Sequence, residues 1–258
     1  MTDERIFRLD GKVALVTGGG GGIGSAICTL FANVGARVAC VDLNQEAAEK
    51  TAAAIRRAGG QAMGVACDVT DEAQTLAAAR RVESEYGPVT VLVTGAAPLD
   101  RSGTILDITP DEWDTVVRTH LGGAYLMSRA VLPGMIGAGG GAVVHIASMH
   151  AHVGRGGRSP YTSAKGSLLQ LTRTMAVDHA ADGVRVNSLS PGAVWTQRIA
   201  FRYGTMSPEV RKEAESKYLL KRFADPSEIA NAALFLASPA ASYMTGSDIV
   251  VDGGYTAV

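Results

Sequence analysis

Short apolar runs rich in Val, Ala and Ile alternate along the chain with longer segments in which apolar residues have helical spacing. Such runs are typical of strands buried on both faces, and the segments between them are long enough to form helices. The pattern predicts seven strands, near residues 12–17, 37–42, 61–67, 89–94, 142–148, 184–190 and 247–251. Because strands separated by helices favour right-handed crossovers, we expect an α/β fold: a doubly wound, mostly parallel seven-stranded sheet with helices on both faces.

The pattern also predicts a single domain. No Pro- or Ser-rich linker, charge run or internal repeat divides the 258 residues, so residues 1–258 are expected to form one unit. A long excursion at about 194–222 separates the sixth strand from the next helix. Segments of this kind often act as lids over a substrate, and we expect that role here.

Composition limits the partners that the chain can have. Hydrophobic residues make up 47% of it and charged residues 19%, and the formal net charge is −1, which lacks the basic excess of a nucleic-acid binder. Nucleic acid and anionic membranes are therefore not expected as partners. The N-terminal sequence MTDERIFRLDG is acidic where a secretory signal would be basic, and no stretch approaches the ~20 apolar residues of a membrane span. A cytoplasmic location is expected.

Cysteine and histidine spacing does not predict a metal site. Cys28, Cys40 and Cys67 lie inside apolar elements at spacings that fit no zinc site, and we interpret them as buried thiols. His150 and His152 flank one alanine, but no Cys, His or carboxylate cluster accompanies them in the sequence. No metal is expected.

A glycine-rich turn follows the first predicted strand. KVALVT leads into GGGGGIG, and the helical pattern SAICTLFANVG comes next. Gly18 can adopt turn dihedrals closed to other residues, while Gly22 and Gly24 allow a pyrophosphate to approach the backbone and the helix N-terminus. A flexible glycine linker is the alternative. The regular strand and helix on either side favour a dinucleotide site.

An acidic residue ends the second predicted strand. In RVACVD, Asp42 lies twenty-four residues beyond Gly18, about where a dinucleotide site places a carboxylate on the adenosine ribose. A carboxylate there accepts hydrogen bonds from the ribose hydroxyls and repels a 2′-phosphate. No Lys or Arg follows directly to offset it, since the next residues are Leu43, Asn44 and Gln45. The sequence therefore favours NAD over NADP, although Asp42 could also cap the next helix.

A serine, a tyrosine and a lysine carry the chemistry. Tyr161 and Lys165 are one helical turn apart, so phenol and ammonium share a helix face. A free tyrosine titrates near ~10, and a nearby cation favours its phenolate, which makes Tyr161 a usable acid/base. Ser148 ends the apolar run AVVHIAS, where its hydroxyl could hydrogen-bond a substrate oxygen. Interconversion of an alcohol and a carbonyl needs these groups.

With these motifs the chain resembles, from end to end, the short-chain dehydrogenase/reductase family, in the branch that has a Ser-Tyr-Lys active site and about the length of this chain. The matching residues are Thr17, Gly18, Gly22, Ile23 and Gly24 in the glycine turn, Asp68 and Val69 after the third strand, Ser148, Tyr161 and Lys165, then Asn187, Pro191, Gly192 and Thr196, and the closing GSDIVVDGGY.

The resemblance implies a Rossmann fold and the roles of several residues. Tyr161 would be the acid/base and Ser148 would orient the substrate. Lys165, and Tyr161 with it, would also contact the cofactor, where Lys165 holds the nicotinamide ribose. The other implied cofactor contacts are the glycine turn with Ile23, Asp68 and Val69 beside the adenine, Pro191 and Gly192, and Thr196 on the nicotinamide carboxamide.

Two positions depart from the family pattern. Where the family usually has Asn-Asn-Ala-Gly after the fourth strand, this chain has Thr94-Gly95-Ala96-Ala97. His120 stands where the resemblance implies an asparagine that holds a water in a proton relay from the lysine. A histidine can also hydrogen-bond a water, and it titrates near ~6.5. Its alternatives are a place in the catalytic relay or simple packing inside a helix.

The function expected from these features is NAD-dependent hydride transfer between a secondary alcohol and its ketone. The substrate is expected to be a small polar molecule, such as a sugar, polyol or hydroxy acid, and could be anionic, because guanidinium groups suit carboxylate, sulfonate or phosphate oxygens. The substrate-side candidates are His150, Arg155, Arg158, Trp195, Arg198 and Arg202. Ordinary solvated loop arginines are the alternative.

Two other functions remain open, and one assembly is expected. The same fold supports NADPH-linked 3-oxoacyl reductases, against which Asp42 argues, and a non-catalytic NAD-binding regulator, for which His120 is the only support. The resemblance and the apolar ending DIVVDGGYTAV indicate a homotetramer with the last strand at a subunit contact.

Overall fold

The computed structural model describes residues 4–196, 199 and 207–258, and its strands form one parallel seven-stranded sheet. The strand order is β3-β2-β1-β4-β5-β6-β7. The strands are β1 (Val13–Thr17), β2 (Arg37–Asp42), β3 (Gln61–Ala66), β4 (Val91–Thr94), β5 (Gly141–Ile146), β6 (Val184–Pro191) and β7 (Asp248–Val251). The predicted doubly wound α/β fold is confirmed, and each strand lies where its apolar run predicted it.

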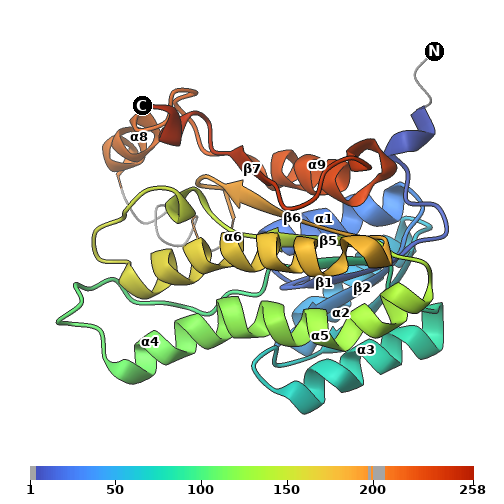
Figure 1. Cartoon of the computed structure of the whole chain (residues 1–258). Coiled ribbons are helices and arrows are strands. Elements are labelled where there is room, and N and C mark those ends of the chain that lie inside the picture. The colour runs from blue at the N-terminus through green and yellow to red at the C-terminus, as the bar shows by residue number, and fades with distance from the viewer. Residues whose placement is uncertain (1–3, 197–198, 200–206) are drawn as a thin grey trace.

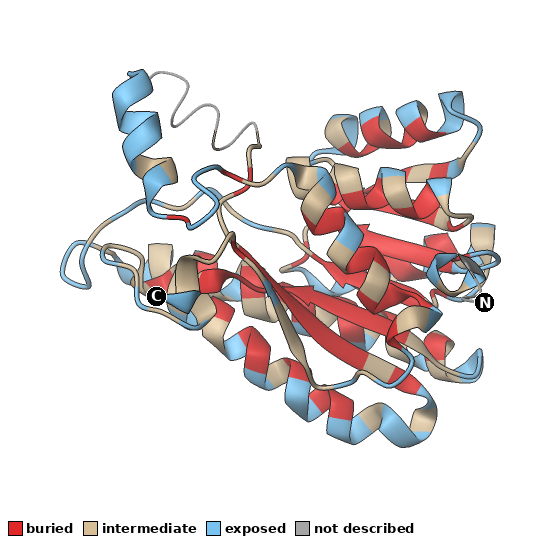
Figure 2. Ribbon diagram, turned by 90° about the horizontal axis from the view of Figure 1, so that it is seen from above, coloured by how far each residue is buried: buried red, intermediate tan, exposed pale blue. Residues whose placement is uncertain are grey.

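Helices cover both faces of the sheet (Figure 1). They are α1 (Gly22–Asn33), α2 (Gln45–Arg57), α3 (Glu72–Tyr86), α4 (Pro110–Val117), α5 (Gly123–Gly137), α6 (Ser159–His179), α8 (Pro208–Ser216) and α9 (Pro226–Ala237). Apolar side chains of α1, α2 and α9 pack on one face, and those of α3, α5 and α6 pack on the other. The strands between these two cores are mostly buried on both faces (Figure 2), which explains why they are continuous apolar runs rather than alternating ones.

The carboxyl ends of the strands meet at one edge of the sheet. The strand order reverses between β1 and β4, which are neighbours although β2 and β3 separate them in sequence. Ligands of open parallel sheets bind beyond the carboxyl ends at such a switch point. Thr17, Asp42, Thr94 and Pro191 end their strands there, and Ser148 follows β5 closely.

The helical run from Pro110 to Gly137 contains a π-helical turn. A capping box between Thr109 and Glu112 begins α4, and the π-helical turn Arg118–Gly122 joins α4 to α5. Such turns often occur at functional positions because the extra residue changes which side chains face inward. Here His120 is buried, with 4% of its surface exposed.

The two ends of the excursion expected at 194–222 lie side by side. Trp195 N donates to the Ala224 carbonyl at 2.7 Å, and Ala224 N donates to the Ala193 carbonyl at 2.9 Å. Between them α8 has a largely exposed surface and lies away from the sheet (Figure 2). Its role as a lid stays a prediction.

A buried side-chain hydrogen bond links β4 and β5 at their carboxyl ends. His145 lies opposite Thr94 in the sheet, and the Thr94 hydroxyl is 2.8 Å from His145 Nδ1. His145 is fully buried, and its Nε2 atom has no hydrogen-bond partner among the described residues. Burial, and then the positive charge of Lys165, lower the pKa of this imidazole from 6.5 to about 4.

Acid should therefore destabilise the protein through His145. Between pH 6.5 and 4 the unfolded chain binds a proton at this imidazole that the folded chain excludes, so the free energy of unfolding falls as the pH falls through this window. The expected loss is about 3 kcal/mol. Urea unfolding at a series of pH values measures it. In His145→Asn, which cannot titrate, the slope should decrease, and an unchanged slope would show that His145 does not exclude a proton when folded.

Candidate active site

The glycine turn has the geometry of a phosphate cradle. Gly18 has a φ of +73°, and a Cβ added there would come within 2.8 Å of the Gly95 carbonyl oxygen. A Cβ on Gly24 would collide with the Gly18 carbonyl, so neither position accepts a side chain. Helix α1 begins at Gly22, directly after the turn, and its first N–H groups lack partners within the helix. The turn therefore places the free N–H groups at the start of α1 on the wall of a cleft, as a phosphate site would require.

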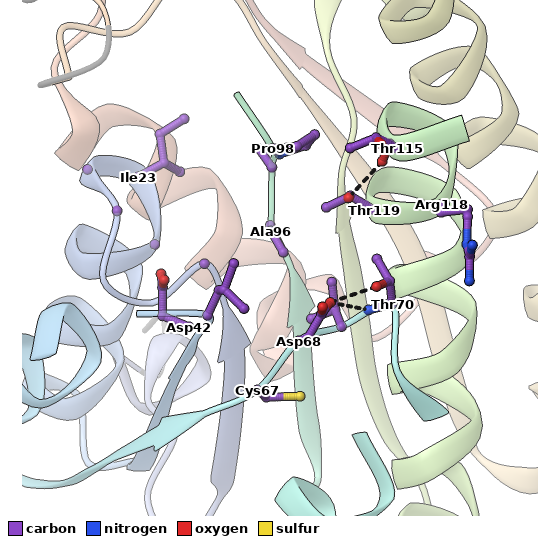
Figure 3. Close-up of a pocket in the computed structure, with 18 of the residues that line it drawn as sticks. Ile23, Asp42, Cys67, Asp68, Thr70, Ala96, Pro98, Thr115, Arg118 and Thr119 are labelled. Atoms are coloured by element: carbon purple, nitrogen blue, oxygen red, sulfur yellow. Dashed lines mark hydrogen bonds between the residues drawn. The ribbon is translucent and has the colours of Figure 1, made fainter. Parts of the chain in front are cut away.

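A cleft of about 890 Å³ extends from this turn across the carboxyl ends of the strands (Figure 3). This volume suits a large organic cofactor. Its walls include Gly18, Gly22, Ile23, Gly24, Asp42, Asp68, Val69, Gly95, Ala96 and Thr196. Thr196 closes the cleft against the turn, since its methyl group occupies the space that a Cβ on Gly22 would need. The residues predicted to bind the cofactor thus gather here, apart from Tyr161 and Lys165 beside the second cavity and Pro191 and Gly192 at the end of β6.

Backbone hydrogen bonds fix the carboxylate of Asp42 at the edge of this cleft. Its two oxygens accept from Gly20 N and Asn44 N, each at 3.0 Å. Asn44, not Asp42, caps α2, because its side chain accepts from Ala47 N at 3.1 Å. Asp42 therefore does not cap α2, which the sequence had also allowed. Its carboxylate joins the glycine turn to the end of β2.

Asp68 and Val69 lie on the next wall of the cleft. One oxygen of Asp68 accepts from both the backbone and the hydroxyl of Thr70 at 2.8 Å, as the dashed lines in Figure 3 show. Val69 packs so closely on α5 that a Cβ on Gly123 would collide with it. Both residues thus have fixed positions beside the cleft.

The departure at 94–97 leaves the loop after β4 in place. The Thr17 hydroxyl accepts hydrogen bonds from Gly95 N at 3.0 Å and from Ala96 N at 3.2 Å. Gly95, Ala96 and Ala97 line the cleft through small side chains and backbone. Thr17 and the Thr94–His145 pair thus hold this loop and its strand without the family's asparagines.

A second cavity, of about 370 Å³, contains Ser148 and Tyr161. Ser148 follows β5, and its hydroxyl accepts from His150 N at 3.2 Å. Tyr161 lies in the first turn of α6, with Lys165 one turn later and buried. Lys165 Nζ donates to the Ile146 carbonyl at 2.6 Å and lies 5.9 Å from the centre of the Tyr161 ring. The predicted serine, tyrosine and lysine therefore converge.

His120 reaches the same place from the π-helical turn. Its ring packs edge-on against the Tyr161 ring, with 5.4 Å between the ring centres. The buried side chains of His120 and Lys165 thus lie beside the partly buried Tyr161 ring, from two helical segments. The sequence could place His120 in a helix but could not show that its ring contacts the tyrosine.

The substrate-side candidates divide into three groups. His150, Arg155 and Arg158 line the second cavity. Trp195 is not among its described lining residues and stacks instead on Phe223, with 6.1 Å between the ring centres. Arg198 and Arg202 lie outside the described residues. Burial first, and then the charges of Arg155 and Arg158, lower the pKa of His150 to about 4.

Sequence reasoning missed several residues of this cavity. Tyr218, Phe223 and Tyr255 supply aromatic walls, and Lys217 lies at its rim. Asp100 forms an ion pair with Arg158 at 2.5 Å. Only Tyr255 had a signal, since it ends the closing GSDIVVDGGY. The others come from the 194–222 excursion, from Phe223 directly after it and from the loop after β4, where no periodic pattern shows which side chains face inward.

Two further observations concern the whole described chain. In residues 4–196, 199 and 207–258, no three His, Cys, Asp or Glu side chains are grouped closely enough to hold a metal ion. Among the helices that the structure describes, none combines the length and apolar character that a membrane crossing requires.

Known proteins share this fold and these motifs over nearly the whole chain. A family model described as enoyl-(acyl carrier protein) reductase matches residues 18–256. D-threitol dehydrogenase of Mycolicibacterium smegmatis is 42% identical over 252 residues, covering 97% of this chain and 95% of that protein.

Two solved structures show the cofactors that such proteins bind. A gluconate 5-dehydrogenase from Burkholderia cenocepacia, in complex with NADP and tartrate, has a TM-score of 0.92 at 31% identity and covers 98% of each chain. A 7α-hydroxysteroid dehydrogenase complexed with NADH and a 7-oxo bile acid, also at a TM-score of 0.92, is 35% identical over 98% of this chain. Relatives thus use either nicotinamide cofactor on CH–OH groups. By its family model, its relatives and its fold, the chain belongs to the short-chain dehydrogenase/reductase family.

Proposed function

We propose that this protein is an NAD-dependent oxidoreductase that interconverts a small polar secondary alcohol and its ketone. The observation that supports it most is the convergence of Ser148 and Tyr161 on one cavity, with Lys165 buried beside the tyrosine. The glycine turn and cleft fit a dinucleotide, because Gly18 and Gly24 permit a tight backbone turn that brings the start of α1 to the wall of the cleft. When bound, the nicotinamide supplies the hydride acceptor or donor.

In this proposal the proton chemistry belongs to the chain's own residues. In the oxidative direction Tyr161 takes the proton of the substrate hydroxyl, and Ser148 holds that oxygen by a hydrogen bond. The Lys165 cation, fixed by the Ile146 carbonyl, favours the phenolate of Tyr161. Lys165, the glycine turn, Asp68, Val69, Pro191, Gly192 and Thr196 would hold the cofactor.

His120 takes part in the proton relay in this proposal. The observation that supports this role is that the buried His120 ring contacts Tyr161 from the π-helical turn, beside the tyrosine and lysine. A neutral imidazole has a lone pair that can accept a proton or a water hydrogen, and the cation has none. The relay should therefore be blocked when His120 is protonated.

The choice of NAD rests on Asp42. Its carboxylate is fixed at the cleft edge by two backbone hydrogen bonds and would meet a 2′-phosphate with like charge. The cleft also contains Arg118, but this residue lies on the opposite wall from Asp42 (Figure 3). An NADPH-linked 3-oxoacyl reductase, the other enzyme activity that this fold supports, is therefore the less favoured function. A non-catalytic regulator is disfavoured by the intact Ser148, Tyr161 and Lys165.

Assembly and location stay predictions. β7 ends the sheet, and Val250 on it is 40% exposed, so an apolar edge is available for a subunit contact. This supports the proposed homotetramer. The cytoplasmic location rests on the sequence alone.

The variant Tyr161→Phe should lose about 10²- to 10⁴-fold in kcat, because only the proton acceptor is removed. Its Kd for NAD should stay within a factor of two or so of the wild type. Lys165→Ala should weaken both turnover and NAD binding, since the ammonium serves the phenol and the ribose. Steady-state kinetics with fluorescence titration of the cofactor measure these values. Substantial turnover in Tyr161→Phe would end the mechanism.

The wild type should bind NAD far more tightly than NADP. In Asp42→Ala the affinity for NAD should fall about ten-fold, because a charge-assisted hydrogen bond is lost, and the affinity for NADP should rise. Calorimetric titration of both cofactors measures the change. Asp42→Asn is a matched control, since it keeps a hydrogen-bond acceptor and removes only the charge. Equal affinities in the wild type would contradict the NAD preference.

The pH profile of kcat/KM should show the role of His120. In the oxidative direction the wild type should lose activity on the acid side with one more titration than His120→Asn, because protonation removes the lone pair that accepts the proton. His120→Asn should retain turnover, since an amide can also bind a water. If the two profiles superimpose, His120 only packs against Tyr161.

A further inference from the structure

The charged side chains that line the second cavity are all cationic. Its ionised lining side chains are Arg155, Arg158 and Lys217, and none of its described lining residues is an aspartate or glutamate. His150 also lines the cavity but stays neutral near pH 7, because burial and the neighbouring arginines lower its pKa to about 4. The fixed charge facing a substrate is therefore positive.

One of these three cations already has a buried counter-ion. Arg158 forms an ion pair with Asp100, whose side chain is 3% exposed, and its guanidinium lies 4.9 Å from the centre of the Tyr161 ring. Gly103 N donates to the Gly157 carbonyl at 3.0 Å beside it, so the loop after β4 is fastened to the start of α6. Arg158 thus packs against the Tyr161 ring, and the carboxylate of Asp100 largely compensates its charge.

Arg155 and Lys217 remain for a ligand. Arg155 is half-buried in the segment between Ser148 and Tyr161, and Lys217 follows α8 directly. Among the described residues, neither side chain has an ion pair or a hydrogen bond. Two uncompensated cations at one partly enclosed cavity repel each other and attract an anion. An anion between them would also join α8 to the loop that carries Ser148.

Aromatic and apolar side chains form part of the remaining wall of the cavity, beside Ser102, Ser148 and the tyrosine hydroxyls. Tyr218, Phe223 and Tyr255 pack on one another, with ring centres 5.2 to 5.8 Å apart. Met149 and Phe223 are buried in the same cluster. The carbon skeleton of a small substrate can pack against these aromatic and apolar surfaces.

We propose that the substrate is a small secondary alcohol that carries one anionic group, a carboxylate, sulfonate or phosphate, held by Arg155 and Lys217 while its hydroxyl lies at Ser148 and Tyr161. This inference rests on the proposed dehydrogenase function and narrows it to one substrate class. A guanidinium donates two parallel hydrogen bonds to such oxygens, and an ammonium acts as a point charge. The charge pair thus selects for an anion at a fixed distance from the reacting carbon.

The test compares substrates that differ only in charge. 3-Hydroxybutyrate, 2-hydroxypropanesulfonate and 2-hydroxypropylphosphonate share the group CH₃–CH(OH)–CH₂, and methyl 3-hydroxybutyrate is the neutral counterpart. Hydroxy acids with one to three further methylene groups vary the distance from the hydroxyl to the anion. NADH formation should give a kcat/KM at least about ten-fold higher for the best anion than for its neutral methyl ester.

Charge-neutral variants then locate the anion. Arg155→Gln and Lys217→Gln should each raise KM for the best anion by about ten-fold and leave kcat, KM for NAD and KM for the neutral ester unchanged. Lys212→Gln removes the same charge from exposed α8 at a position that does not line the cavity, and it should change nothing. Equal effects on the anion and the ester, or none on either, would overturn the proposal.

Binding without turnover separates the two proposals. Acetoacetate and its methyl ester are titrated calorimetrically into the enzyme–NADH complex of the wild type and of Arg155→Gln, each with the Tyr161→Phe substitution to prevent reaction. If neutral alcohols are oxidised but the anion binds no better than the ester, the substrate class is wrong and the dehydrogenase function stands. If the anion binds through Arg155 but no alcohol of either series is oxidised, the dehydrogenase function is wrong and the anion site stands.

Discussion

The hydrogen bond from Lys165 to the Ile146 carbonyl is the interaction on which the rest of the site depends. A buried ammonium is costly unless polar groups surround it, and here a strand's last carbonyl accepts from it at 2.6 Å. Ile146 is the last residue of β5, so its carbonyl lies at the carboxyl edge of the sheet, where the Lys165 side chain reaches it. The bond fixes the rotation of α6 on the sheet, and with it the position of Tyr161 one turn earlier.

The parallel sheet brings the other parts of the site to this point. Because every strand ends at the same edge, the glycine turn after β1, Asp42 after β2 and Ser148 after β5 meet without long loops. The segment after β6 then separates two spaces, with Gly192 and Ala193 lining the smaller cavity and Thr196 lining the larger cleft. A dinucleotide and a small substrate can thus lie side by side.

The sequence predicted the features that depend on local patterns and missed those that depend on distant contacts. Strands buried on both faces appear as continuous apolar runs, so their positions were evident. The glycine turn was evident because the run GGGGGIG follows an apolar strand directly. The structure shows why glycine is needed there, since Gly18 has a φ of +73°. The Asp100–Arg158 ion pair joins residues that no motif relates, and the π-helical turn that brings His120 to Tyr161 has no sequence signal of its own. Tertiary packing decides such contacts.

The cations of the site favour the neutral form of its histidine rings and the ionised form of a tyrosine ring. A positive charge disfavours an imidazolium, and together with burial this lowers the pKa of both His145 and His150 to about 4. The same charges stabilise a phenolate, because that group becomes negative when it loses its proton. In the proposed mechanism Lys165 beside Tyr161 favours an ionised tyrosine, while Lys165 acts on His145, and Arg155 and Arg158 act on His150, to help keep these two histidines neutral. In the proposed mechanism a phenol is therefore the ring that a neighbouring cation can help to turn into a base, and the proposed anionic substrate would be attracted by the cations that line the same cavity.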